Sequence, residues 1–165
     1  MKISPLLLLA FIGTAAASDW PSWRGPDGNG KLPNDAKYPT EWSATKNLKW
    51  KIDLPGPGNS SPIVVDGKVL LTQATDSGKT RSLLCFSAEN GALLWEKAVD
   101  YGKQDTTHRT NPYCAASPVS DGKLVFAWHG NAGLHAYDLD GNEKWNRNLG
   151  TDYEHIWGPN AASPV

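Results

Sequence analysis

Short sequence motifs recur along this chain at intervals of about 45 to 56 residues, and this repetition restricts its fold more than any other feature. Within the region after residue 47, a Ser-Pro pair recurs at spacings of 56 and 46 residues: Ser61, Ser117 and Ser163. A tryptophan occupies an equivalent point of each repeat, at spacings of 45 and 50 residues: Trp50, Trp95 and Trp145. Periods of this length indicate that one structural unit is repeated along the chain.

Each repeat divides into four short runs of strand-forming residues. In the first repeat, the runs SPIVV, KVLLTQAT, RSLLCFSA and ALLWEKAV are separated by the turn sequences DG, DSGK and ENG. The second repeat has the same order, with SPVS, KLVFAWHG, LHAYDL and NEKWNRNL. Asp-Gly between apolar runs favours a tight hairpin, because glycine adopts positive φ at low cost. Four antiparallel strands in each period predict the blade of an all-β propeller.

The region before the repeats has two parts. Residues 1–18 combine a basic start, the apolar run PLLLLAFIG and the small residues TAAAS, which is typical of a secretory signal peptide cleaved near Ala17 or Ser18. The apolar run is too short to span a bilayer, so we expect no membrane span in the mature chain and a periplasmic or secreted location. The alternative is a retained membrane anchor. Residues 19–47, rich in Pro, Gly and Trp, predict an amino-terminal arm.

Residues 48–165 are assigned to the propeller. We place one blade at 61–99, a second at 117–149 and the start of a third at 160–165, with Trp50 on a strand before the first blade. Propellers close with four to eight blades, so the chain is expected to be the amino-terminal part of a longer protein. The alternative is a small two-sheet domain, which would leave exposed strand edges.

Charge and cysteine content exclude some functions and leave others open. The net charge is −1, with 16 basic and 17 acidic residues and no long block of one sign, which argues against nucleic acid as a partner. The pattern contains no Cys-x-x-Cys or His/Cys cluster for zinc. Cys85 and Cys114 could form one disulfide in an oxidising compartment, but the apolar run around Cys85 favours a buried free thiol.

Two segments carry a family resemblance. CFSAENGALLW, Cys85 to Trp95, resembles the tryptophan-docking motif Ala-x-Asp-x-x-Thr-Gly-x-x-x-Trp of quinoprotein propellers, with Gly91 and Trp95 matching. AYDLDGNEKW is the same motif one residue shorter, with Gly141 and Trp145 matching. Together with SPV and WPSWRGPDGNG, they make the chain similar to exported bacterial, planctomycete-type proteins with pyrroloquinoline-quinone-like (PQQ-like) repeats. The resemblance implies a fold more strongly than a chemistry.

The matching glycines and tryptophans predict structural docking rather than ligand binding. A glycine at the turn between the third and fourth strands permits a tight bend, and an indole four residues later can wedge between blades. We expect this role for Gly91, Trp95, Gly141, Trp145 and, by its position in the repeat, Trp50.

The connections between blades hold the candidate functional residues. The loops Asp100 to Tyr113 and Gly150 to Asn160 each contain one histidine, His108 and His155. Other polar and aromatic residues accompany them: Tyr101, Lys103, Asp105, Arg109, Asn111, Asp152, Tyr153, Glu154 and Trp157. A metal pair of the two histidines would lack a third ligand. The remaining reading is that these are solvated surface loops.

Three functions remain open at this stage. The first is an exported binding or scaffold propeller without a catalytic residue, whose partner at the channel mouth is a protein, a small molecule or a carbohydrate. The second, implied by the resemblance, is a dehydrogenase that oxidises an alcohol or sugar with PQQ and calcium, held by Arg109, Asn111, Asp152 and Trp157. The vicinal Cys-Cys pair typical of such enzymes is missing. The third is carbohydrate binding through exposed tryptophans: Trp20, Trp23 and Trp42.

Overall fold

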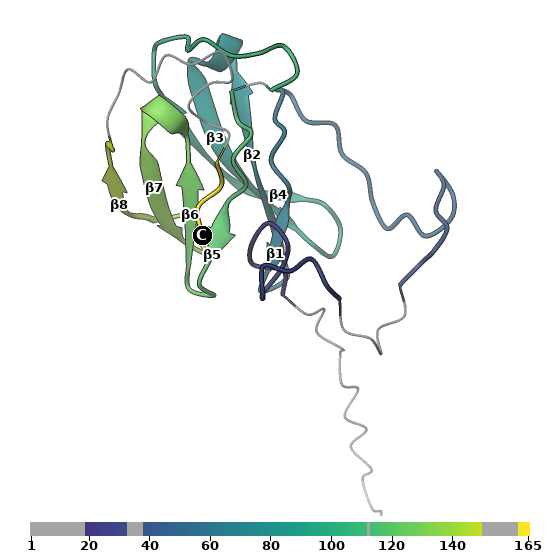
Figure 1. The fold of residues 1–165 in the computed structure, drawn as a ribbon. Coiled ribbons are helices and arrows are strands. Elements are labelled where there is room, and N and C mark those ends of the chain that lie inside the picture. The colour runs from purple at the N-terminus through teal and green to yellow at the C-terminus, as the bar shows by residue number, and fades with distance from the viewer. Residues whose placement is uncertain (1–18, 33–37, 112, 150–161) are drawn as a thin grey trace, which may run out of the picture.

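A computed structural model of the chain describes residues 19–32, 38–111, 113–149 and 162–165. These residues form two four-stranded antiparallel sheets, each with its strands in chain order (Figure 1). The first sheet contains β1 (Ile63–Val65), β2 (Lys68–Thr75), β3 (Thr80–Ser87) and β4 (Leu93–Asp100). The second contains β5 (Val119–Ser120), β6 (Leu124–Trp128), β7 (Leu134–Asp138) and β8 (Glu143–Arg147). Single 3-10 turns, η1 (Asp76–Gly78) and η2 (Gly130–Ala132), join the second strand to the third in each sheet.

The observed strands confirm the predicted all-β blades. β2 coincides with the run KVLLTQAT, and the Asp66-Gly67 hairpin before it has positive φ at both residues, 47° and 67°. A turn of this kind suits the twist of the strands that it joins. Within each sheet, the third strand pairs with the fourth through a register shift, between Cys85 and Phe86 and between Ala136 and Tyr137. The two sheets are therefore two copies of one blade.

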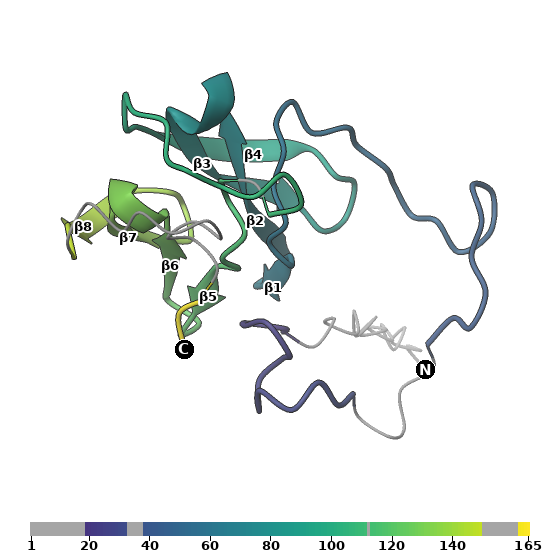
Figure 2. The ribbon, with the colours of Figure 1, turned by 45° about the horizontal axis from the view of Figure 1, so that its top comes forward.

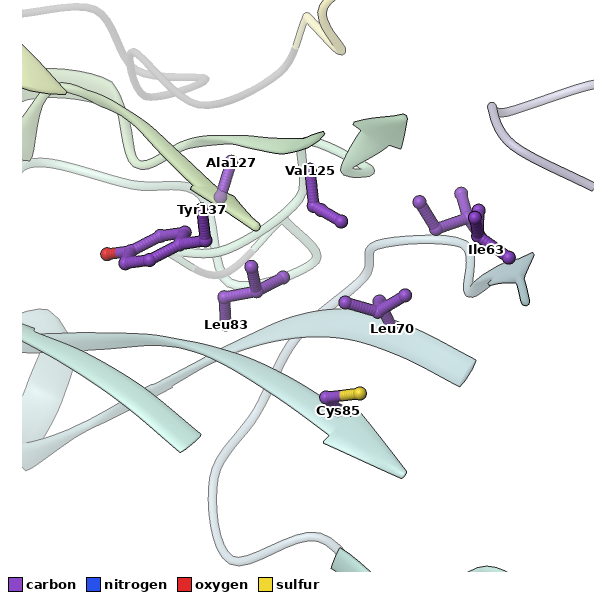
Figure 3. Close-up of a cluster of buried hydrophobic side chains, with 8 residues drawn as sticks. Ile63, Leu70, Leu83, Cys85, Val125, Ala127 and Tyr137 are labelled. Atoms are coloured by element: carbon purple, nitrogen blue, oxygen red, sulfur yellow. The ribbon is translucent and has the colours of Figure 1, made fainter. Parts of the chain in front are cut away.

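The main hydrophobic core lies between the two sheets. Leu70 and Leu83 of the first sheet face Val125, Ala127 and Tyr137 of the second, and all five are buried (Figure 3). Alternate residues of a strand point to opposite faces, so Leu83 and Cys85 of β3 join Val125 and Ala127 of β6 in one apolar cluster. The blades are held face to face by this cluster, as a repeat that cannot bury its faces alone requires.

The amino-terminal arm contacts the first strand of each sheet, β1 and β5 (Figure 2). We call this side of the two sheets the inner edge. Trp20 exchanges two backbone hydrogen bonds with Val64 of β1, at 2.7 and 2.9 Å. One residue later, the Pro21 carbonyl accepts a hydrogen bond from the Ser120 amide of β5 at 2.8 Å. Trp20 is half-buried, so its predicted exposure is wrong: backbone pairing fixes the residue against β1, and its ring covers Gly25.

The strand expected around Trp50 is also wrong. Residues 48–54 have no regular secondary structure, although they lie just before the first blade. This segment contacts the turn between β3 and β4 through the Trp50 side chain instead of pairing with a strand edge. A predicted strand without a partner edge gains no ladder of hydrogen bonds.

Two further predictions concern the cysteines and the membrane. Cys85 and Cys114 are both free and buried, as the apolar context of Cys85 favoured. Burial raises the pKa of Cys85 to about 11 and that of Cys114 to about 12. The predicted signal peptide, residues 1–18, lies outside the described residues. In the described part of the chain, no helix has the length and apolar character that crossing a membrane requires.

Candidate ligand-binding site

Tryptophans of one repeat contact glycines of the next, so this contact joins successive repeats. The Trp95 indole of β4 lies against Gly141 in the turn between β7 and β8, and its Nε1–H donates to the Leu139 carbonyl at 3.1 Å. Trp50 contacts Gly91 in the same way and donates to the Ala88 carbonyl at 3.1 Å. Gly91 and Gly141 therefore have two roles. Each forms the turn before the fourth strand of its own sheet, and each contacts the indole of the preceding repeat.

Trp145 belongs to the same series but points to the outer face of the second sheet. Its ring centroid lies 5.7 Å from that of Phe126, and the Arg147 guanidinium lies 5.7 Å from the ring centroid. By its place in the repeat, Trp145 is equivalent to Trp50 and Trp95.

The repeated Ser-Pro pairs form a second link between repeats, at the inner edge. The Ser61 amide donates to the Ser117 hydroxyl at 2.8 Å, and the Ser117 amide donates to the Ser163 hydroxyl at 3.0 Å. A proline follows each serine, and since proline lacks an amide N–H, the serine amide is the donor available at this point. The three equivalent serines are thus joined into a ladder that runs from repeat to repeat.

A pocket of about 450 Å³ opens beside this serine ladder. Its walls come from the arm, from both inner edges and from the carboxy-terminal residues: Ser22, Trp23, Arg24, Gly28, Asn59, Ser61, Ala115, Ser117, Ala162, Ser163, Pro164 and Val165. The volume falls in the range of small-ligand sites. The polar side chains of these residues are hydroxyl, amide and guanidinium groups, and none of them is a carboxylate, imidazole, ammonium or thiol. We take this pocket as the candidate binding site.

Trp23 and Arg24 give the pocket an aromatic and a cationic wall. Trp23 is 56% exposed, and the Arg24 guanidinium lies 5.4 Å from its ring centroid. Arg24 has φ of +86°, a conformation that non-glycine residues rarely adopt. The Gly30 amide donates to the Arg24 carbonyl at 2.8 Å and fixes this conformation. Trp and Arg are both residue types enriched at binding hot spots.

Of the four residues predicted for a cofactor, the structure places two. Arg109 is exposed, and Asn111 closes a short turn in which its amide donates to the His108 carbonyl at 2.8 Å. Asp152 and Trp157 lie outside the described residues, as does His155. Among the described residues, no group of three His, Cys, Asp or Glu side chains could hold a metal ion. The predicted cofactor site therefore stays a prediction.

The structure also brings together a buried polar cluster that was not foreseen. Arg81 of β3 is fully buried and forms an ion pair with Asp105 of the loop between the blades. Its guanidinium also donates to the His129 carbonyl and to the Gly78 carbonyl, the latter at 3.0 Å, and lies 4.9 Å from the Tyr101 ring centroid. Arg81 and Asp105 are 24 residues apart, and no sequence motif relates a strand arginine to a loop aspartate at that spacing. Their pairing therefore could not be predicted from the sequence.

His129 and His135 lie between the two sheets, next to this cluster. His129 is fully buried, and neither ring nitrogen has a hydrogen-bond partner among the described residues. Burial, reinforced by the nearby His135 and Arg81, lowers the pKa of His129 to about 3. His129 is therefore neutral at pH 7. His135 is also buried, at 8% exposure, and its two ring nitrogens lie 3.2 Å from a Glu143 carboxylate oxygen and 3.1 Å from the Ala132 carbonyl oxygen.

Repeated four-stranded blades, docked tryptophans and a ladder at the inner edge define a β-propeller with PQQ-like repeats. The chain belongs to that family: the family model described as outer membrane protein assembly factor BamB matches residues 39–163. The fold class predicted from the repeat is thereby confirmed.

Two solved structures are similar to part of the chain. BamB from Moraxella catarrhalis has 20% identity and a TM-score of 0.44, over 62% of this chain and 27% of that one. The quinohemoprotein alcohol dehydrogenase ADHIIG from Pseudomonas putida HK5 has 24% identity and a TM-score of 0.42, over 64% of this chain and 15% of that one. This chain therefore spans less than a third of the length of either protein. Comparison with curated proteins gave no match.

Proposed function

We propose that this chain is part of an exported propeller that binds a polypeptide partner and acts as a scaffold. The observation that carries the proposal is the chemistry of the pocket. The described lining residues offer hydrogen-bonding groups, one cationic side chain and an exposed indole, and none of them is an Asp, Glu, His, Lys or Cys for proton transfer. Trp and Arg are the residue types that dominate the binding energy of protein interfaces.

The family and the amino terminus support the same proposal. The matching family model is described as an outer membrane assembly factor, which is a role in bringing proteins together. The basic, apolar and small-residue sequence of residues 1–18 favours export to the periplasm or beyond. Amino-terminal sequencing of the exported protein should give a start near Ser18 or Asp19; a mature protein that retains Met1 would contradict export by cleavage.

A PQQ- and calcium-dependent dehydrogenase fits the described residues less well. A quinone with several carboxylates needs cations, an aromatic platform and oxygen ligands for calcium. The described part of the predicted set supplies one exposed arginine and one asparagine held in a turn. We therefore derive no catalytic step. Incubation of the full-length protein with PQQ and Ca²⁺ should give no dye-linked oxidation of alcohols or sugars, and turnover would favour the enzyme instead.

Carbohydrate binding through tryptophans is also less well supported. Of the three tryptophans considered, Trp20 is half-buried and Trp42 is 75% exposed but does not line the pocket, so Trp23 is the one tryptophan among the described lining residues. They do not form one platform in the pocket, which stacking on a sugar would require.

In-cell photo-crosslinking tests the scaffold proposal. A photoreactive phenylalanine analogue replaces Trp23 in the exported full-length protein, and the same analogue at Trp42 serves as a matched control. Both positions are exposed tryptophans of the arm, but only Trp23 lines the pocket. We expect a discrete protein adduct from position 23 and a much weaker one from position 42. No adduct at position 23, or equal adducts at both positions, would refute a partner at this pocket.

A further inference from the structure

We propose that the pocket is a carboxylate-binding subsite, in which Arg24 pairs with a carboxylate of the partner and Trp23 stacks on the apolar group beside it. The inference rests on the proposed function, because it names the part of a polypeptide partner that the pocket recognises. The carboxylate can come from the end of a chain or from an acidic side chain, and the experiment below separates these sources.

The charge of the lining is one-sided. Among the lining residues that the structure describes, Arg24 carries the one charged side chain, and none of the described residues places a side-chain carboxylate on its guanidinium. The guanidinium is held instead over the Trp23 ring. Arginine presents its donors in a planar fork that matches a carboxylate, and stacking on an indole leaves the edge of that fork available.

A buried hydroxyl supplies a second donor. Ser117 is 3% exposed and lines the pocket. Its oxygen accepts a hydrogen bond from the Ser61 amide, while none of the described residues accepts one from its hydroxyl hydrogen. A serine hydroxyl can donate and accept together, so this hydrogen is available to a ligand oxygen.

Asn59 adds a group suited to a peptide. Its side-chain nitrogen donates to the Thr110 carbonyl at 2.9 Å, and its backbone amide donates to the Cys114 carbonyl at 2.9 Å. These contacts fix the side chain at the edge of the pocket and leave its amide oxygen as an acceptor. A peptide N–H beside the bound carboxylate is a matching donor.

The site is built before any ligand arrives. The Ser22 hydroxyl donates to the Gly25 carbonyl at 2.6 Å, and the arm is bonded to β1 and β5 on either side. Arg24 is held at positive φ between these anchors. Unfavourable backbone conformations of this kind persist where the surroundings enforce them, often at ligand sites. A preorganised site loses less entropy on binding.

The experiment follows binding of short peptides to the full-length protein by NMR shifts of the tryptophan indole N–H groups. The probes are Ac-Gly-Phe with a free carboxyl end, its amide Ac-Gly-Phe-NH₂, and Ac-Phe-Glu-NH₂, which carries only a side-chain carboxylate. We expect Ac-Gly-Phe or Ac-Phe-Glu-NH₂ to bind at least about tenfold more tightly than Ac-Gly-Phe-NH₂, as charge-assisted hydrogen bonds imply. Whichever acid binds identifies the source of the carboxylate.

Variants locate the binding. Arg24→Asn suits the positive φ and should abolish the preference for the acid, whereas Arg24→Lys should keep part of it. Arg147→Gln is the matched control, because Arg147 also lies over a tryptophan but outside the pocket. A thermal unfolding midpoint close to that of the unmodified protein shows that each variant is folded. Equal binding of acids and amide, or an unchanged preference in Arg24→Asn, would overturn the subsite. An adduct at position 23 would then still support a partner at this pocket.

Discussion

Gly141 offers a direct test of how the blades are joined. Its φ is +82°, and a Cβ added there would lie 2.6 Å from Lys97 Cε and 2.9 Å from Trp95 Cδ2. Alanine at this position therefore meets two penalties. The left-handed conformation costs about 1–2 kcal/mol for a residue with a Cβ. Displacing the Trp95 indole from its contact with residue 141 costs about 1–3 kcal/mol more. We expect Gly141→Ala to lower the free energy of unfolding by about 2–5 kcal/mol in total.

Gly122 provides the matched control. It has φ of +89°, and a Cβ added there meets nothing within 4 Å. Gly122→Ala should therefore cost only the conformational part, about 1–2 kcal/mol. Urea unfolding of the two variants, followed by tryptophan fluorescence and circular dichroism, measures the difference between them.

A double-mutant cycle isolates the contact with the indole. Trp95→Ala removes the side chain that Gly141 receives, so Gly141→Ala in that background should cost no more than Gly122→Ala. The coupling energy between the two sites should be about 1–3 kcal/mol. Equal costs for Gly141→Ala and Gly122→Ala in the otherwise unmodified chain would refute the idea that the glycine is required by the docked indole.

Three further predictions concern the buried groups. Arg81→Met leaves Asp105 buried without its cation and should cost about 3–5 kcal/mol, and adding Asp105→Asn should recover part of this loss; purely additive costs would contradict the pairing. The folded chain protonates His129 only near pH 3, whereas an unfolded histidine does so near 6.5, so the free energy of unfolding should fall as pH is lowered between these values, by up to about 1.4 kcal/mol per unit. His129→Phe should flatten that slope in urea titrations, and an unchanged slope would assign it elsewhere. The raised pKa values of Cys85 and Cys114 predict no alkylation by iodoacetamide at about pH 8 until urea unfolds the chain; fast labelling of the native protein would show that the thiols are accessible.

The repeat links local sequence to long-range structure at the inner edge. The Ser-Pro motif recurs because the amide of one serine donates a hydrogen bond to the hydroxyl of the equivalent serine in the next repeat. Ser117 takes part twice: its hydroxyl accepts from Ser61 and its amide donates to Ser163. The arm adds a further link, since Trp20 pairs with the first sheet and the Pro21 carbonyl accepts from the second. The inner edge of these two blades is thus held by hydrogen bonds of backbone groups and serine hydroxyls, while apolar side chains pack between their faces.

Local patterns were sufficient to predict the blades. Strand-forming runs such as KVLLTQAT and turns such as Asp66-Gly67 specify their own conformation, because strand propensity and positive φ depend on neighbouring residues. The docking role of Trp95 followed from its spacing after a glycine. The strand predicted around Trp50 was wrong because a strand forms only beside a partner strand edge. In the described structure, residues 48–54 pair with no such edge, and the local sequence does not show this.

The candidate site could not be predicted in the same way. The pocket gathers Trp23 and Arg24 of the arm, Asn59 before the first blade and Ser163 near the carboxy terminus, and no local pattern relates these positions. The loop residues chosen for their chemistry, Arg109 and Asn111, share no such lining. By itself, the sequence determined the repeat, the strands and the turns, because these depend on short-range backbone preferences. The tertiary structure alone decided which glycine receives each indole, which aspartate pairs with Arg81 and which side chains face the pocket, because those contacts arise only when distant segments pack together.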